Sequence, residues 1–134
     1  MAHWRLDIAL LPERYAVCRM DPDTPAPTWA MRGPLTSIVR NGTDLCIVCP
    51  ERDAPSRVKK LTGWRCLRVA GDMDHTGESG VLLTVVEPLA RAGVPVFPIT
   101  SWDEGYILIH EPHVEKALAT LTAWGHTIHD QPRV

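Results

Sequence analysis

The chain contains an internal repeat, and this repeat limits the folds that it can adopt. When the sequence is aligned with itself so that Ser37 falls on Pro98, SIVRNGTDLCIVC (37–49) matches PITSWDEGYILIH (98–110) without a gap. The same alignment pairs apolar residues elsewhere: Leu6 with Leu67, Ile8 with Val69, and Leu35 with Val96. Repetition at such a period indicates two similar supersecondary units. Units of about 60 residues each are small for a stable core, so we expect the two to pack together.

Both aligned segments are predicted to be β-hairpins. In the first, two apolar runs flank Asn41-Gly42, a dipeptide typical of hairpin turns. In the second, apolar runs flank Ser101–Gly105. The second turn carries Trp102 beside two carboxylates, which a hairpin turn does not require. The turn is therefore a candidate wall of a binding site.

The other elements are predicted from hydrophobic periodicity and from helix start and stop signals. The expected strands outside the hairpins are 5–11, 14–20, 64–71 and a short one within 126–130, with Pro12-Glu13 separating the first two. One helix is expected from about residue 81, with Thr76 or Ser79 as its cap, Pro88 inside it and Gly93 at its end. A second helix is expected over about 112–124, ended by Gly125.

Two segments are not expected to form long regular elements. The proline-rich segment 21–34 has room for only a turn or two of helix, and the polar segment 52–63 is expected to be a linker or an exposed segment. The pattern predicts an α+β fold of two βαββ-type units, 1–60 and 61–134.

Composition excludes several classes of function. The formal net charge is -2 and no run of Lys or Arg is longer than Lys59-Lys60, so a nucleic-acid-binding surface is not expected. No apolar run approaches the roughly 20 residues that span a bilayer. The N-terminal segment 1–15 has too short an apolar stretch, interrupted by Asp7, for a signal peptide. We therefore expect a cytoplasmic protein that binds neither nucleic acid nor membrane.

The cysteines and histidines do not indicate a metal site. On a strand, the spacing of Cys46 and Cys49 places the two side chains on opposite faces, and no second pair has metal-ligand spacing. Buried reduced thiols are the favoured interpretation of all four cysteines. Neither His110-x-x-His113 nor His126-x-x-His129 lies on a continuous predicted helix, so solvated or capping histidines are favoured.

Catalysis is not expected from the motifs. The chain has no G-x-S-x-G motif and no persuasive Cys/His/acid set. Asp103 and Glu104 are adjacent, and on a strand they would point to opposite faces, which does not suit a two-carboxylate mechanism. We expect that the chain is not an enzyme and that it needs no cofactor.

Five segments that together cover nearly the whole chain resemble a known family. They are LPERYAVCRM (11–20), LTSIVRNGTDLCIVCPE (35–51), GWRCLRVAG (63–71), AGVPVFPITSWDEGYILI (92–109) and EPHVEKALATLTAWGH (111–126). They are similar to small stand-alone tandem ACT-domain proteins of bacteria. That group is related to the regulatory domains of aspartate kinase and to the cellular arginine sensors of animals.

The resemblance implies a fold and a function. It implies two tandem ferredoxin-like (ACT) units of the βαββαβ type, with sheets joined edge to edge and with strands that can be exchanged between units. It implies regulatory binding of a small molecule, typically an amino acid, where neighbouring units meet, and no catalysis. The second hairpin departs from the family pattern, because Gly105 replaces the Asp that usually precedes Tyr106. In the alignment of the repeat, its counterpart in the first hairpin is Asp44.

The chemistry of a free amino acid indicates where it would bind. Backbone N–H groups at a helix N-terminus suit its carboxylate, and the segment 74–82 offers them with glycines that permit close approach. Its ammonium needs a carboxylate or carbonyl groups, for which Asp103 and Asp74 are candidates. The predicted ligand-binding residues are Asp74, His75, Thr76, Gly77, Ser79, Gly80, Val81, Leu82, Thr100, Ser101, Trp102 and Asp103.

Simpler readings of the same residues stay open. The glycines Gly77 and Gly80 would then only shape a β-to-α turn, Ser79 would only cap the helix, and each aspartate would be a solvated loop acid. Trp102 would line a ligand's side chain or pack on a partner subunit. Two function classes follow: an amino-acid-binding regulatory module, or a structural protein–protein interaction domain that has lost its ligand. We expect a two-fold homodimer in either case, with Trp102 or Trp124 near the contact.

Overall fold

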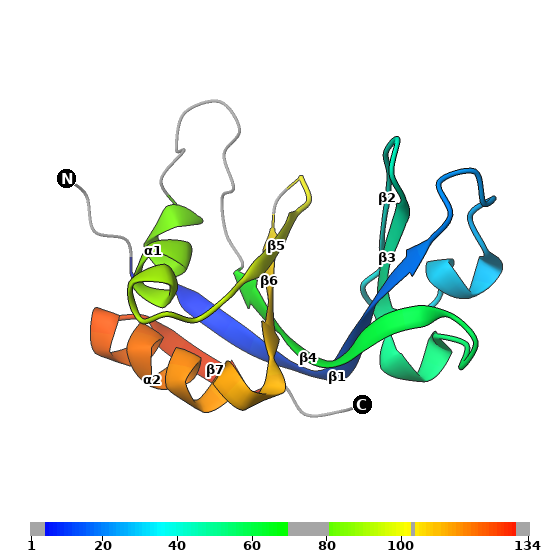
Figure 1. The fold of residues 1–134 in the computed structure, drawn as a ribbon. Helices are drawn as coiled ribbons and strands as arrows, with labels where there is room; N and C mark the ends of the chain where they lie inside the picture. The colour runs from blue at the N-terminus through cyan, green and yellow to red at the C-terminus, as the bar shows by residue number, and fades with distance from the viewer. Residues whose placement is uncertain (1–4, 70–80, 103, 131–134) are drawn as a thin grey trace. The chain divides into compact units, whose positions relative to one another are not determined.

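The computed structural model of the protein describes residues 5–69, 81–102 and 104–130 (Figure 1). The chain divides into two compact units. The N-terminal unit is Glu13–Trp64, and the C-terminal unit is Arg65–Val134 together with Met1–Pro12. Two long strands, β1 (Asp7–Met20) and β4 (Lys59–Val69), each contribute residues to both units. The predicted ranges 1–60 and 61–134 for the ACT-like units stay a prediction.

The N-terminal unit has the chain order of a βαββαβ fold with very short helices. After β1 come η1 (Thr28–Met31), β2 (Ser37–Arg40), β3 (Leu45–Pro50), η2 (Glu51–Asp53) and the first half of β4. The strand order is β2-β3-β1-β4. Its buried cluster comes from β1, β3 and η1 and consists of Ala16, Cys18, Ala30, Leu45, Ile47 and Cys49. Single turns of 3-10 helix thus cover this core where longer helices would be expected in the fold.

The C-terminal unit follows the same order with two α-helices. After β4 come α1 (Leu83–Arg91), β5 (Phe97–Thr100), β6 (Gly105–His110), η3 (Glu111–His113), α2 (Val114–Trp124) and β7 (Thr127–Asp130). The strand order is β1-β4-β6-β5, and β7 pairs in parallel with β1. In the described parts of the chain, neither helix has the length and apolarity needed to cross a membrane.

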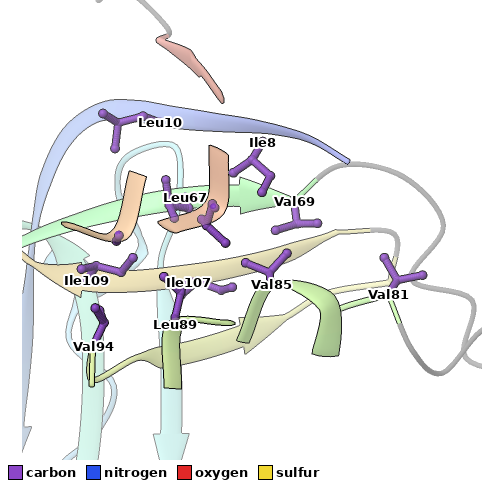
Figure 2. Close-up of a cluster of buried hydrophobic side chains, with 12 residues drawn as sticks. Ile8, Leu10, Leu67, Val69, Val81, Val85, Leu89, Val94, Ile107 and Ile109 are labelled. Atoms are coloured by element: carbon purple, nitrogen blue, oxygen red, sulfur yellow. The ribbon is translucent and has the colours of Figure 1, made fainter. Parts of the chain in front are cut away.

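One face of the C-terminal unit's strands carries the larger core. Side chains from β1, β4 and β6 meet side chains from α1 and α2 in one buried cluster, which Figure 2 draws with ten of its members labelled. Its members are Ile8, Leu10, Leu67, Val69, Val81, Val85, Leu89, Val94, Ile107, Ile109, Ala117 and Leu121. Burial of an aliphatic side chain of this size stabilises the fold by roughly 1.5–3 kcal/mol. The α+β fold with two βαββαβ-type units is as predicted.

The predicted helix ends are confirmed, but the predicted cap of the first helix is not. Gly93 follows α1 with a φ of 76° and Gly125 ends α2 with a φ of 113°, conformations that favour glycine. The N-cap of α1 is Leu82, without a side-chain capping hydrogen bond. Thr76 and Ser79, the predicted caps, lie outside the described residues.

The two hairpins are confirmed, but the predicted register of the repeat is wrong by one position. Ser37–Arg40 corresponds to Phe97–Thr100 and Leu45–Pro50 to Gly105–His110, so Ser37 is equivalent to Phe97 and not to Pro98. The pairing agrees, since Arg40 lies opposite Leu45 and Thr100 opposite Gly105. Apolar residues match nearly as well in the predicted register, but a slip of one position exchanges the two faces of a strand.

The correct register changes the reading of the second hairpin. Asp44 is equivalent to Glu104, not to Gly105. The carbonyl oxygen of Asp44 accepts a hydrogen bond from the Asn41 amide at 3.0 Å, and that of Glu104 accepts one from the Ser101 amide at 2.8 Å. The carboxylate equivalent to that of Asp44 is therefore the one of Glu104, whereas Gly105 still stands where the family pattern has Asp before Tyr106.

Two predicted strand boundaries are also wrong. Residues 5–11 and 14–20 are not separate strands, because β1 runs without a break through Pro12. Near this proline, which has no N–H of its own, the Arg65 guanidinium donates a hydrogen bond to the Leu11 carbonyl at 3.1 Å. The polar segment 52–63 is not only a linker, because β4 begins within it at Lys59. The Lys60 side chain donates a hydrogen bond to the Pro55 carbonyl at 2.9 Å.

The first hairpin should depend on Asn41 more than the second depends on Ser101, its equivalent. The Asn41 Oδ1 atom accepts hydrogen bonds from the Thr43 and Asp44 amides at 2.7 and 2.9 Å. Among the described residues, Ser101 Oγ donates one hydrogen bond, to the Glu104 carbonyl at 3.3 Å. We expect Asn41→Ala to lower the free energy of unfolding by about 1 kcal/mol in urea denaturation and Ser101→Ala to have a smaller effect. Equal losses would contradict this account.

Candidate functional site

The first turn of α1 is held by Thr84. Its amide and its Oγ both donate to the Val81 carbonyl, at 3.3 and 2.8 Å. The amides of Val85 and Val86 both donate to the Leu82 carbonyl at 3.0 Å. Helical pairing therefore begins at the amide of Thr84, and the helix cannot itself pair the amides of Leu82 and Leu83.

The charge at this end of α1 suits an anion. The first turn carries no acidic side chain, whereas Arg91 lies in the last turn. The partial positive charge of the helix N-terminus is therefore not compensated within the helix. The turn is also fixed in place, because Val81 is 5% exposed and belongs to the core together with Val85.

The tip of the β5–β6 hairpin combines a large exposed ring with a part-buried polar pair. Trp102 is 82% exposed, and Thr100 and Ser101 are exposed. At the start of β6, the Tyr106 hydroxyl donates a hydrogen bond to a carboxylate oxygen of Glu104. The tip thus offers an apolar surface, hydroxyl groups and a carboxylate that already has one partner.

The environment of Tyr106 favours its neutral form. Burial raises the pKa of Tyr106 to about 12, and the hydrogen bond to Glu104 and the charge of Glu104 act in the same direction. The positive charge of Arg68, on β4, acts against this shift in the pKa. Tyr106 is therefore a hydrogen-bond donor to Glu104 over the whole physiological pH range.

The structure describes five of the twelve predicted site residues. Val81 and Leu82 lie at the start of α1, with the Val81 side chain buried in the core and Leu82 packed against it. Thr100, Ser101 and Trp102 lie at the end of β5 and in the turn that follows. The other seven, Asp74, His75, Thr76, Gly77, Ser79, Gly80 and Asp103, lie outside the described residues. Both described groups belong to the C-terminal unit.

His126 was missed by the sequence analysis, which favoured a solvated or capping histidine. It is 3% exposed and bridges two elements through its ring. Nδ1 lies 3.1 Å from the Leu6 amide nitrogen, and Nε2 lies 3.0 Å from the Thr84 carbonyl oxygen in the first turn of α1. The only sequence signal for this role of His126 is Pro88, which lies one helical turn after Thr84. A proline at this position removes one helical N–H.

The four cysteines are free thiols in the structure; Cys18, Cys49 and Cys66 are buried, as predicted, and Cys46 is half-buried. Cys49 belongs to the core of the N-terminal unit, where its hydrogen bond to Cys18 lowers the pKa of Cys18 and raises that of Cys49. Burial raises the pKa of Cys66 to about 12. Among the residues that the structure describes, no cluster of His, Cys, Asp or Glu could hold a metal ion.

Tyr106 gives the site a pH-dependent property that can be measured. Its pKa in the folded protein, about 12, lies above the ordinary value of 10.0. The resulting stabilisation is present below pH 10 and is lost as the pH rises through 12. An ultraviolet difference titration of wild type against Tyr106→Phe should place ionisation near pH 12, and Glu104→Gln should move it toward 10. A wild-type midpoint near 10 would contradict the geometry of this pair.

Comparison with known proteins identifies the C-terminal unit. Residues 60–123 match the family model of the ACT domain, and residues 13–57 match a second model, described as an N-terminal domain. A search of curated proteins found no match. The matched ranges follow the division into two compact units closely.

Solved structures show the same fold. A protein from Agobacterium tumefaciens is 28% identical with a TM-score of 0.90, and the alignment covers 97% of this chain and 96% of that chain. The regulatory subunit of aspartate kinase from Thermus thermophilus, in a ligand-free form, is 14% identical with a TM-score of 0.61, covering 87% and 95%. Aspartate kinase from Synechocystis is 18% identical with a TM-score of 0.64, covering 96% of this chain and 28% of that chain. Residues 60–123 therefore match the ACT domain family, and the chain has the fold of an aspartate kinase regulatory subunit.

Proposed function

We propose that the protein is a non-catalytic sensor that binds a free α-amino acid in its C-terminal unit. The observation that carries this proposal is the ACT domain at 60–123, which supports a regulatory ligand-binding role. The regulatory subunit of aspartate kinase from Thermus thermophilus, which has the same fold, supports the same class of function. We choose an amino acid as the ligand because the unit offers a helix N-terminus for a carboxylate and acidic side chains for an ammonium group.

The helices favour the C-terminal unit over the N-terminal one. The helix α1 is 9 residues long, and its first turn carries no acidic side chain. The corresponding element of the N-terminal unit, η1, is a short 3-10 turn preceded by Pro27, which has no N–H to offer. A helix dipole able to attract a carboxylate is therefore found in α1 and not in η1.

The proposed binding mode uses both ends of a zwitterion. Backbone N–H groups of Gly80–Leu82 take the carboxylate. Asp103 or Asp74, with carbonyl groups near Thr100 and Ser101, takes the ammonium. Trp102 lines the side-chain end of the ligand. The hairpin also keeps the Glu104 carboxylate at the position equivalent to Asp44, which adds negative charge near the proposed ammonium position.

A homodimer is proposed from the strand edges. The strand β2 ends the strand order of its unit and exposes apolar side chains, with Ile38 and Val39 exposed by 38% and 54%. The strand β5 lies at the end of the strand order in the C-terminal unit, and Trp102 follows it closely in the sequence. Exposed apolar edges of this kind tend to be paired or covered.

Ligand binding should be visible as stabilisation. In a thermal-shift screen of the twenty amino acids, we expect at least one to raise the melting temperature, because a ligand at about 100 Kd stabilises the folded state by about 2.7 kcal/mol. If calorimetry detects no binding of any amino acid, this function is wrong, and the protein–protein interaction domain is the alternative that remains.

The ammonium contact can be tested by a matched pair of variants. A charge-assisted hydrogen bond contributes roughly 1.5–3 kcal/mol, so Asp103→Ala should weaken amino acid binding about ten- to a hundredfold in isothermal titration calorimetry. Thr43→Ala, at the equivalent position of the first hairpin, should leave the affinity unchanged. Equal losses in both variants would place the site elsewhere.

The oligomeric state is a separate prediction. Light scattering over a wide concentration range should give twice the chain mass of 14.9 kDa. Val39→Lys, which puts a charge on the exposed edge of β2, and Trp102→Lys, at the tip beside β5, should show which edge forms the contact. A mass of one chain at every concentration would exclude the homodimer.

A further inference from the structure

Pro88 creates a defect in α1. In an α-helix the carbonyl of each residue accepts a hydrogen bond from the N–H one turn later in the chain. Proline has no N–H, so the proline inside α1 removes the helical donor for the carbonyl of Thr84. A buried carbonyl that loses its donor costs free energy unless another group replaces it.

The His126 ring stands at that carbonyl. Its Nε2 lies 3.0 Å from the Thr84 carbonyl oxygen, and its Nδ1 lies 3.1 Å from the Leu6 amide nitrogen. The Leu6 amide can only donate, so Nδ1 is the acceptor. In neutral imidazole the proton is then on Nε2, which donates to Thr84.

The backbone around His126 holds the ring in place. Gly125 is in the left-handed conformation, and the amides of Gly125 and His126 donate to the carbonyls of Thr122 and Leu121 at 3.1 and 3.0 Å. This pattern is a Schellman motif, which ends α2. The next amide, of Thr127, donates to the Leu6 carbonyl at 2.9 Å. The backbone on either side of His126 is therefore held by the end of α2 and by Leu6, which directly precedes β1.

We propose that His126 is a positioning residue for the first turn of α1, supplying the N–H that Pro88 lacks. Thr84 links this contact to the turn, because its amide and Oγ both bind the Val81 carbonyl. Holding Thr84 thus holds the backbone of 81–84, where the ligand carboxylate is proposed to bind. The consequence for ligand binding rests on the proposed function, whereas the hydrogen bond to Thr84 does not.

The tautomer is the first test. In ¹⁵N-labelled protein at about pH 8, where histidine is neutral, NMR should show His126 with its proton on Nε2 and with Nδ1 unprotonated. A proton on Nδ1 would overturn the proposal, because that tautomer cannot donate to Thr84.

A double-mutant cycle is the second test. His126→Asn keeps a side-chain acceptor close to the position of Nδ1 but removes the donor to Thr84. We expect it to raise the equilibrium constant for unfolding about tenfold, and only about twofold in a Pro88→Ala background, where residue 88 regains its own N–H. His129→Asn, at an exposed histidine paired with Asp7, should have the same effect in both backgrounds. An equal effect of His126→Asn in the two backgrounds would contradict the proposal.

Affinity for the amino acid found in the screen distinguishes this inference from the proposed function. At a temperature where every variant is folded, His126→Asn should weaken binding, and adding Pro88→Ala should restore it. Unchanged affinity in folded His126→Asn would exclude the role in binding. If wild type binds no amino acid, the proposed function fails, and the NMR and the cycle still decide whether His126 holds α1.

Discussion

The packing of α1 and α2 against one face of β4 and β6 is the constraint on which the C-terminal unit depends. Val85 and Leu89 from α1 and Ala117 and Leu121 from α2 are fully buried in the same cluster as the strand residues. When the apolar face of a helix packs into a core, the first turn is also fixed in position, provided that its backbone groups are hydrogen-bonded. The amides at the start of α1 therefore have fixed positions, and fixed donors bind a ligand with less loss of conformational entropy than mobile ones.

The two units share one topology but differ in how well their helix ends suit an anion. Both follow the order strand, helix, two strands, helix, strand, and their hairpins correspond strand for strand. In the N-terminal unit the helices are reduced to single 3-10 turns over a small core. A turn of this length has little dipole, so only the C-terminal unit has, among the described residues, a helix end suited to an anion. The ACT-domain match at 60–123 falls largely on that unit.

Much of the fold could be predicted because local signals agreed with it. Gly93 and Gly125 end the helices at the residues expected, and Asn41-Gly42 and Ser101-Trp102 lie in the turns between paired strands. The register of the repeat could not be fixed, because apolar residues follow one another closely in both hairpins and match in either register. Where β1 continues through Pro12, the Leu11 carbonyl accepts a hydrogen bond from Arg65, which is distant in the sequence. The burial of His126 likewise depends on Leu6 and on Thr84, both far from it along the chain. Of the predicted site, only the ends of two segments are described, so its assembly stays a proposal.

Hydrogen exchange measured by mass spectrometry, with and without each amino acid, directly tests whether an amino acid binds at the first turn of α1. It reports on the backbone amides that the account assigns to the ligand, and it does so along the whole chain. We expect a binding amino acid to slow exchange in the first turn of α1 and in the β5–β6 hairpin and to leave exchange in the β2–β3 hairpin unchanged. Slower exchange confined to the N-terminal unit, or no change with any amino acid, would contradict it.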